Sequence, residues 1–176
     1  AVYGNAGAHG GDVNASLLLA EILQHGKGRV KWTSEDMAFA YRSSKIKRDP
    51  GKAIILSASF RGTLDDPEAI QERMQKNVAH RKKTQPPGAS TGSTFKNPEG
   101  DYAGRLIEAC GLKGTQIGGV KVSELHGNFF VNYENAAAED YWQLIQLVRK
   151  TVYEKFNVKL ELEIEPIGFK TNIEGA

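Results

Sequence analysis

The stretch Gln85-Pro86-Pro87-Gly88 limits what this chain can fold into more than any other feature. Proline fixes φ and removes a backbone donor, while glycine permits positive φ, so helices and strands both tend to end at such a stretch. The full length of 176 residues suits one ordinary domain or two small ones. We therefore expect a domain boundary here, with one domain over residues 1–84 and a second over residues 85–176.

The first part shows mixed helix and strand signals. Residues 29–33 and 52–62 read as strands, and we expect Ile54, Ile55 and Leu56 to form an apolar core. Thr33 or Ser34 is placed to cap a short helical turn. The run Asp65-Asp66-Pro67-Glu68 predicts the start of a helix that ends before Gln85, because it combines a cap residue, an early proline and a first-turn acid.

The second part predicts two helices and three strands. A helix over residues 101–111 is stopped by Gly111, and the longest helix covers residues 136–156. Strands are expected in "TQIGGVKVSE", in "NFFVNYE" and in the final "KLELEIEPIGF", where leucine and isoleucine alternate with glutamate. Gly118-Gly119 indicates a bulge or a close backbone approach. The whole chain is therefore expected to have an α+β fold.

Composition excludes several classes of function. Hydrophobic residues make up 40% and charged residues 25%, which is typical of a globular protein, and no apolar run approaches the roughly 18 residues of a membrane span. The net charge of +2 is scattered and gives no reason to expect a nucleic-acid partner. The cluster His80-Arg81-Lys82-Lys83 is either a solvated helix end or a polyanion site. A single cysteine, Cys110, excludes an internal disulfide, fits a reducing compartment and reads as a buried thiol. No cysteine or histidine spacing indicates a metal site.

Polar residues gather at a few places that chemistry can use. The glycine-rich residues 1–12 read as a surface loop or as a ligand loop. Arg42, beside Tyr41, is either a surface residue or an anion clamp. Ser93 has no GxSxG context and no base placed beside it by sequence, so a serine hydrolase has little support. These residues alone indicate a soluble α+β protein and are compatible with an enzyme that binds an anion.

A set of motifs in one order narrows the interpretation. They are "GNAGAHGGD", "YRSS", "GSTFKNP", "AGRLIEACGLKG", "IGGVKVSELHGNFFVN" and "LELEIEPIG". Together they resemble the latter part of the bacterial UDP-N-acetylenolpyruvoylglucosamine reductases, in the shorter type that lacks a tyrosine-bearing loop. The resemblance covers nearly the whole chain. It implies a cytoplasmic flavoenzyme of peptidoglycan precursor synthesis, which uses NADPH and FAD to reduce UDP-N-acetylglucosamine enolpyruvate to UDP-N-acetylmuramate.

The resemblance also implies domains and residue roles. Residues 1–84 would be the C-terminal part of an FAD-binding domain like that of vanillyl-alcohol oxidases, and residues 85–176 a small α+β substrate-binding domain. Ser93 would donate a proton, Arg42 would hold the substrate carboxylate, and Glu163 would act beside it. The substrate-binding residues would be Tyr41, Lys96 and Asn97, and the cofactor-binding residues Gly4, Asn5, Gly7 and Ala8.

Members of this family carry an N-terminal half ahead of these motifs. The opening "AVYGNAGAHGG" has no initiator methionine and reads like the middle of a protein. We therefore expect a fragment that binds FAD weakly or not at all and has no reductase activity alone, and a monomer when full length. The alternative is a non-catalytic sugar-nucleotide binding module that has kept the fold.

Overall fold

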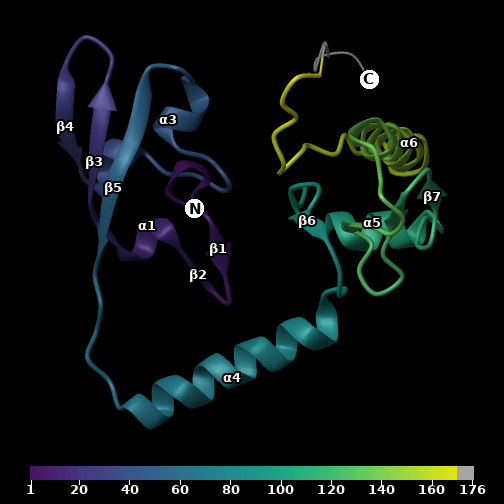
Figure 1. Cartoon of the computed structure of the whole chain (residues 1–176), viewed down its shortest axis with the longest axis horizontal. Coiled ribbons are helices and arrows are strands. Elements are labelled where there is room, and N and C mark those ends of the chain that lie inside the picture. Colours follow the sequence, from purple (N-terminus) through teal and green to yellow (C-terminus); the bar gives the residue numbers. More distant parts are fainter. Residues whose placement is uncertain (170–176) are drawn as a thin grey trace. The chain divides into compact units, whose positions relative to one another are not determined.

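The computed structural model describes residues 1–169, which form mixed helices and strands (Figure 1). The chain divides into two compact units, Ala1–Met74 and Gln75–Ala176, which are described in turn. The domain boundary expected after residue 84 stays a prediction. Within the described residues, no helix combines the length and the apolar character that crossing a membrane requires.

A small hairpin opens the first unit. The 3-10 helix η1 (Val2–Gly4) leads into β1 (Gly7–Ala8), which pairs antiparallel with β2 (Gly11–Asp12). His9 and Gly10 form the turn and both have positive φ, at 53° and 82°. Asp12 then caps the short helix α1 (Val13–Ser16) by accepting a hydrogen bond from the Ala15 amide at 3.0 Å. The glycine-rich start is therefore a folded hairpin.

An antiparallel sheet of order β4-β3-β5 carries the core of the first unit. Its strands are β3 (Leu17–Gln24), β4 (Gly28–Trp32) and β5 (Ala53–Phe60). Ile22 from β3 is fully buried and packs with Met37 of α2 (Ser34–Met37) and Ile46 of α3 (Lys45–Arg48). Thr33 caps α2 and shares a capping box with Asp36, which confirms the predicted helical turn.

The prediction that Ile54, Ile55 and Leu56 form an apolar core was wrong for two of these three residues. Ile55 packs against the core, but Ile54 is 62% exposed and Leu56 42% exposed. The reason is that successive side chains of a strand point to opposite faces of its sheet, and only the face that carries Ile55 packs against the core. A continuous apolar run in the sequence does not show that both faces of a strand are covered.

Helix α4 (Pro67–Thr84) begins and ends where the sequence predicted. Asp66 caps it by accepting a hydrogen bond from the Ala69 amide at 3.0 Å, and Arg81, Lys82 and Lys83 occupy its last turn. None of the residues of α4 is buried. The basic cluster is therefore the solvated end of a helix.

The second unit contains an antiparallel sheet of order β6-β9-β8-β7. Its strands are β6 (Ser90–Ser93), β7 (Gln116–Ile117), β8 (Val120–Val122) and β9 (Phe129–Asn132). The sequence predicted one strand across Gly118-Gly119, and the structure has two strands joined by a turn there, because Gly118 takes a φ of 51°. The predicted close approach is confirmed: a Cβ on Gly119 would lie 2.4 Å from the Glu134 carbonyl oxygen.

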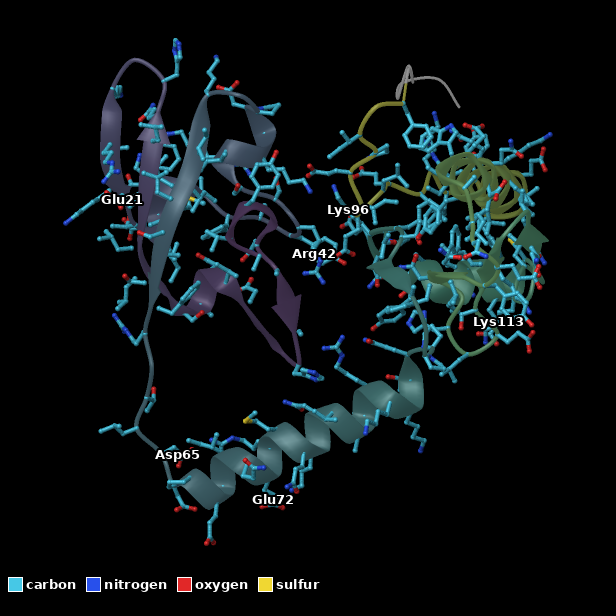
Figure 2. The ribbon with its side chains drawn as sticks, in the orientation of Figure 1. Glu21, Arg42, Asp65, Glu72, Lys96 and Lys113 are labelled. Atoms are coloured by element: carbon cyan, nitrogen blue, oxygen red, sulfur yellow. The ribbon has the colours of Figure 1, made fainter. Side chains whose placement is uncertain are left out.

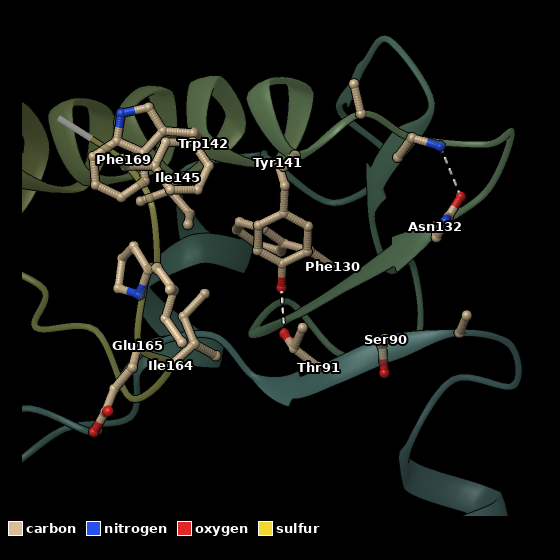
Figure 3. A pocket seen from close by; sticks show the side chains of 16 residues that line it. Ser90, Thr91, Phe130, Asn132, Tyr141, Trp142, Ile145, Ile164, Glu165 and Phe169 are labelled. Carbon is tan, nitrogen blue, oxygen red and sulfur yellow. Dashed lines mark hydrogen bonds between the residues drawn. The ribbon is translucent and has the colours of Figure 1, made fainter. Parts of the chain in front are cut away.

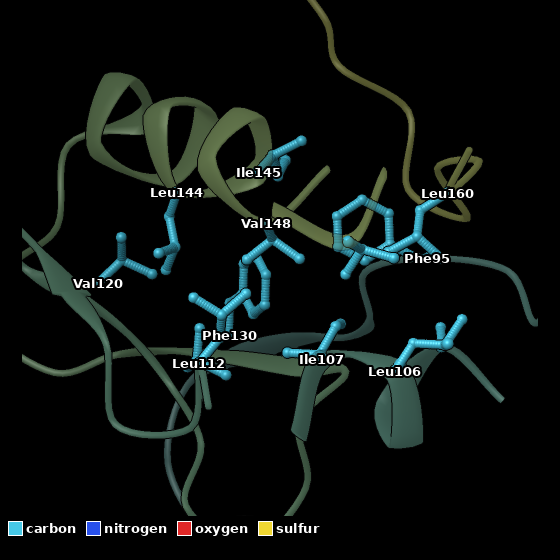
Figure 4. Packing of buried hydrophobic residues seen from close by; sticks show 13 residues of the cluster. Phe95, Leu106, Ile107, Leu112, Val120, Phe130, Leu144, Ile145, Val148 and Leu160 are labelled. Atoms are coloured by element: carbon cyan, nitrogen blue, oxygen red, sulfur yellow. The ribbon is translucent and has the colours of Figure 1, made fainter. Parts of the chain in front are cut away.

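Two helices share one core with this sheet (Figure 4). They are α5 (Ala103–Ala109), which ends before Gly111 at a φ of 73°, and α6 (Ala138–Phe156). The apolar face predicted for the longest helix is confirmed, with Leu144, Ile145, Val148 and Val152 buried. The other fully buried large side chains of this core are Phe95, Leu106, Ile107, Val120, Val122, Phe130 and Leu160.

The final strand predicted for "KLELEIEPIGF" is reduced to a single bridge between Phe95 and Leu162. Two hydrogen bonds flank it: the Lys96 amide donates to the Glu161 carbonyl at 2.8 Å, and the Glu163 amide to the Thr94 carbonyl at 2.9 Å. Pro98 and Pro166 lie just beyond the two sides of this pairing and have no amide to donate, so a longer ladder is disfavoured. The predicted alternation survives, since Leu160, Leu162 and Ile164 face the core.

Candidate functional site

Two of the candidate motifs meet within the first unit. The β1–β2 hairpin and the Tyr41-Arg42 turn line a cavity of about 490 Å³, which also includes His9, Asp12 and Ala15. No atom lies within 4 Å of a Cβ placed on Gly10 or Gly11, so the hairpin backbone is open to a ligand on that side. The structure thus brings together residues that lie some distance apart in the sequence.

Arg42 occupies a tight turn that fixes its position (Figure 2). Ala40 and Ser43 exchange two backbone hydrogen bonds of 3.1 Å around Tyr41 and Arg42, and Arg42 has a φ of 51°. Positive φ is uncommon outside glycine, so the surrounding structure must enforce it. The guanidinium lies 5.1 Å from the centre of the Tyr41 ring and donates to the Gly7 carbonyl at 3.3 Å. A Cβ on Gly7 would lie 3.1 Å from Arg42 Nη1 and 3.1 Å from the Gly11 carbonyl oxygen, so a side chain there would be tight.

The side chain of Asn5 joins the hairpin to the Arg42 turn. Its Nδ2 donates to the Asp12 carboxylate at 3.0 Å and to the Ala40 carbonyl at 3.2 Å. Its Oδ1 accepts from the backbone amide of Asn14 at 3.0 Å. Asn5 is buried, and its side chain bonds within the protein. Of the other predicted cofactor-binding residues, Gly7 and Ala8 line the cavity in β1, whereas Gly4 ends η1 and is not among the lining residues.

The second unit has a polar cavity of about 400 Å³ beside Ser93. Ser93 lies at the end of β6, and Asn97 follows in the next loop. The other polar or charged residues that line it are Tyr102, Arg105, Glu108, His126 and Asn128. These five were not singled out from the sequence. His126 and Asn128 lie within the motif "IGGVKVSELHGNFFVN", but nothing in their spacing indicated that they line a cavity with Ser93.

Ser93 and Glu163 come from neighbouring segments of this unit. The Phe95–Leu162 bridge sets Glu163 opposite Thr94, the residue after Ser93. The described residues that line the polar cavity do not include Glu163 or Lys96. Arg42 belongs to the first unit, so its surroundings are those of the hairpin cavity.

Lys96 and Asn97 both have partners within the second unit. Lys96 Nζ lies 2.9 Å from a Glu161 carboxylate oxygen (Figure 2). The side-chain oxygen of Asn97 accepts a hydrogen bond at 3.1 Å from the amide of Ala103, the first residue of α5. Asn97 therefore satisfies one of the unpaired donors at the start of that helix.

Charged residues around the polar cavity are mostly paired. Arg105 binds Asp101 through two nitrogens, and this hydrogen bonding lowers the pKa of Asp101 to about 2. Lys113 Nζ lies 2.8 Å from a Glu108 carboxylate oxygen. His126 Nδ1 accepts from the Asn128 amide at 3.2 Å, so the neutral ring carries its proton on Nε2. Burial lowers the pKa of His126.

A second cavity in this unit, of about 490 Å³, is largely apolar (Figure 3). Its wall includes Trp142, Ile145, Ile164 and Phe169. The Tyr141 hydroxyl is 2.6 Å from the Thr91 hydroxyl and 3.0 Å from the Thr94 hydroxyl. Burial raises the pKa of Tyr141, although both hydrogen bonds oppose this. The hydroxyl group thereby ties β6 to α6.

Neither the cysteine nor a metal cluster supplies further chemistry in the described part of the chain. Cys110 is partly buried against the core with its Sγ 3.8 Å from the Thr151 carbonyl, and burial raises the pKa of the thiol. A raised pKa disfavours the reactive thiolate. Residues 1–169 contain no group of three histidine, cysteine, aspartate or glutamate side chains placed to hold a metal ion.

Comparisons with known proteins agree on one family. The family model for the C-terminal domain of UDP-N-acetylenolpyruvoylglucosamine reductase matches residues 82–167. Relatives with that reductase name include one from Chloroflexus aggregans, 45% identical over 95% of this chain and 57% of its own length. Another, from Bacillus licheniformis, is 46% identical over 97% of this chain and 92% of its own length.

A solved structure gives the same result. The crystal structure of UDP-N-acetylenolpyruvylglucosamine reductase from Thermus caldophilus matches with a TM-score of 0.81 and 34% identity, over 94% of this chain and 58% of that chain. The chain thus spans somewhat more than half the length of several relatives that it matches, among them those from Chloroflexus aggregans and Bacillus subtilis.

Proposed function

This chain belongs to the UDP-N-acetylenolpyruvoylglucosamine reductase family, and from that membership we propose that it supplies the substrate-binding and proton-donating part of the reductase. The reaction proposed is the NADPH-dependent reduction of UDP-N-acetylglucosamine enolpyruvate to UDP-N-acetylmuramate, in peptidoglycan synthesis. Its partners would be the UDP-sugar and NADPH, and a cytoplasmic location would keep Cys110 reduced. We propose residues 85–176 as the substrate-binding domain.

Two features of the first unit support the proposal of a flavin site. The hairpin backbone is open beside Gly10 and Gly11, and Gly7 leaves room for the Arg42 guanidinium. Gly4, Asn5, Gly7 and Ala8 are the residues of this chain that we propose to hold the FAD, and Asn5 also fixes the hairpin through its side-chain hydrogen bonds. A bound flavin, reduced by NADPH, would supply the hydride for the β-carbon of the enol ether.

The residues of this chain would stabilise the negative charge that forms on hydride transfer. They would also supply the proton that completes the reduction. Negative charge develops toward the substrate carboxylate, and a guanidinium held like that of Arg42 can bind a carboxylate through two hydrogen bonds. We assign Ser93 the donation of its hydroxyl proton to the α-carbon, and Glu163 a place beside the substrate carboxylate. Tyr41 would pack beside Arg42, and Lys96 and Asn97 would contact the UDP-sugar.

The observation that carries the proposal is the placement of Ser93. It lies in the wall of a polar cavity, at the end of β6. The next residue, Thr94, donates its amide to the Asn128 carbonyl and accepts at its own carbonyl from the Glu163 amide. A proton donor must stay within hydrogen-bond reach of its acceptor atom, so a fixed backbone favours the role.

The proposal can be tested in a hybrid enzyme. Ahead of Ala1, the hybrid carries the part of the Bacillus subtilis relative that this chain does not match. Ser93→Ala should leave flavin reduction by NADPH intact and lower substrate reduction by about 10²- to 10⁴-fold, because only the proton donor is lost. Ser90→Ala, a serine of the same strand that lines the apolar cavity instead, is the matched control.

Persistence of both half-reactions in Ser93→Ala would overturn the proton-donor role. Binding of the UDP-sugar without any turnover in the unsubstituted hybrid would favour the alternative, a sugar-nucleotide binding module. For the 176-residue chain itself, we expect weak or no FAD binding, and flavin absorbance retained through gel filtration would contradict this.

A further inference from the structure

The strand that carries Ser93 leaves its ladder at that residue. β6 pairs with β9 at Ser90–Val131 and at Ser93–Phe129, with a register shift between the two pairs and a φ of 82° at Gly92. The next amide, of Thr94, donates to the backbone carbonyl of Asn128 at 2.9 Å. Beyond this point the strand has no regular partner on that side, because β9 begins at Phe129.

The side chain of Asn128 takes the place of the missing strand. Its Oδ1 accepts from the Phe95 amide at 2.9 Å, and its Nδ2 donates to the Phe95 carbonyl at 2.7 Å. Both backbone groups of one residue are therefore satisfied by one carboxamide, as the peptide group of a neighbouring strand would do. Asn128 is only 3% exposed, so these bonds have no competition from bulk water.

Asn128 is itself held in place by a tied loop. Its amide donates to His126 Nδ1 at 3.2 Å, and the Phe129 amide donates to the His126 carbonyl at 3.0 Å. The Ser123 hydroxyl accepts from the amides of Leu125 and His126, at 3.1 and 3.2 Å. The loop that carries the carboxamide is thus also held by hydrogen bonds of its own.

The opposite edge of the same segment is held as well. The Thr94 carbonyl accepts from the Glu163 amide at 2.9 Å, and the Lys96 amide donates to the Glu161 carbonyl at 2.8 Å. Residues 94–96 are therefore bonded on both edges, and Phe95 is buried edge-on against Phe130. Ser93 immediately precedes this fixed segment in the chain and lines the polar cavity.

We propose that Asn128 is a positioning residue for Ser93, acting as a one-residue strand partner that fixes the serine hydroxyl in the cavity wall. This inference rests on the proposed function of Ser93. Asn128 lines the same cavity, but its carboxamide is bonded at both ends to Phe95, so it acts through the backbone. Aspartate would keep the acceptor for the Phe95 amide and lose the donor for the Phe95 carbonyl.

The first test uses the 176-residue chain as it is. In hydrogen exchange followed by NMR, the Phe95 amide should be protected as strongly as the Val131 amide of β9, although its partner is a side chain. Asn128→Leu, which removes both hydrogen bonds to Phe95, should lower that protection by at least about 10-fold while Val131 stays protected. A Phe95 amide that exchanges freely in the unsubstituted chain would overturn the proposal without any variant.

The second test uses the hybrid enzyme described above. Asn128→Asp should leave flavin reduction by NADPH unchanged, keep KM within about 3-fold and lower kcat by about 10- to 100-fold, since a misplaced donor slows only proton delivery. The solvent isotope effect on kcat should rise as that step becomes limiting. The control is Asn132→Asp, whose side-chain oxygen accepts from the Ala136 amide at 2.9 Å and should keep doing so.

The outcomes separate the two proposals. If Ser93→Ala has no effect on substrate reduction, the proposed function itself fails. If Ser93→Ala stops substrate reduction but Asn128→Asp leaves kcat and the isotope effect unchanged, then Ser93 is the donor and Asn128 does not position it. Equal losses in Asn128→Asp and Asn132→Asp would indicate a general loss of stability and would also overturn the positioning role.

Discussion

The imidazole of His126 should titrate below the ordinary histidine range. Burial lowers its pKa, and in the neutral form its Nδ1 accepts a hydrogen bond from the backbone amide of Asn128. Because the folded state then binds a proton less readily than the unfolded state, the stability contribution should be complete above about pH 6.5 and fall as pH drops through the lower folded pKa. NMR titration of the ring gives the midpoint. A midpoint at or above 6.5 would contradict this, and His126→Gln should remove the titration.

The Tyr141 hydroxyl should contribute to the stability of the second unit. Tyr141→Phe removes a partner from the fully buried Thr94 hydroxyl and from Thr91, and should lower the free energy of unfolding by about 1–3 kcal/mol. Urea unfolding followed by Trp142 fluorescence measures this. Tyr153→Phe, on a ring that is 44% exposed, is the control and should change stability far less. Equal losses in the two variants would show that the hydroxyl contacts do not matter.

The sequence indicated which polar residues line the cavities better than it indicated which groups their side chains contact. Ser93 and Asn97 do line one cavity, and Tyr41, Arg42, Gly7 and Ala8 line another. Asn5 and Asn97 were predicted to contact ligands, and this stays a prediction; the structure shows that each also bonds to the protein backbone. A sequence gives the donors and acceptors of a side chain but not the direction in which it points, and for the same reason Asn128 was missed.

At the scale of elements, the turn between β7 and β8 should tolerate no side chain. A Cβ on Gly119 would lie 2.4 Å from the Glu134 carbonyl oxygen and 2.6 Å from Ala136 Cα, and both are backbone atoms that cannot swing aside. Gly119→Ala should therefore destabilise the second unit by about 3 kcal/mol. Gly62→Ala, where no atom lies within 4 Å, is the control. Thermal unfolding of both variants measures the difference, and similar midpoints would contradict the steric argument.

Long periodic elements were predicted well and short ones were not. The helices now seen as α4 and α6 were predicted to within about two residues, because their patterns extend over several turns. The final segment alternates like a strand, but strand identity depends on a partner, and prolines limit its pairing to one bridge. The exposed Ile54 and Leu56 have the same cause: burial depends on what covers a face.

At the scale of the whole molecule, the two units should unfold separately. Their buried clusters share no residue, and each unit contains one of the two tryptophans, Trp32 and Trp142. In a Trp142→Phe background, Ile22→Ala should lower the stability reported by Trp32 by about 2–5 kcal/mol, since Ile22 is fully buried. In a Trp32→Phe background, the same substitution should leave the Trp142 transition in place. A shift of both transitions together would show that the units fold as one.

The edge strand β5 has a practical consequence for all of these measurements. It presents Ile54, Leu56 and Phe60 to solvent, and within residues 1–169 only β3 pairs with it. Such an edge is a template for adding another strand, and apolar side chains favour that addition. This edge should accordingly favour self-association of the polypeptide. A lysine at position 54 is the smallest change that would act as a gatekeeper against self-association, and dilute samples would serve until it is made.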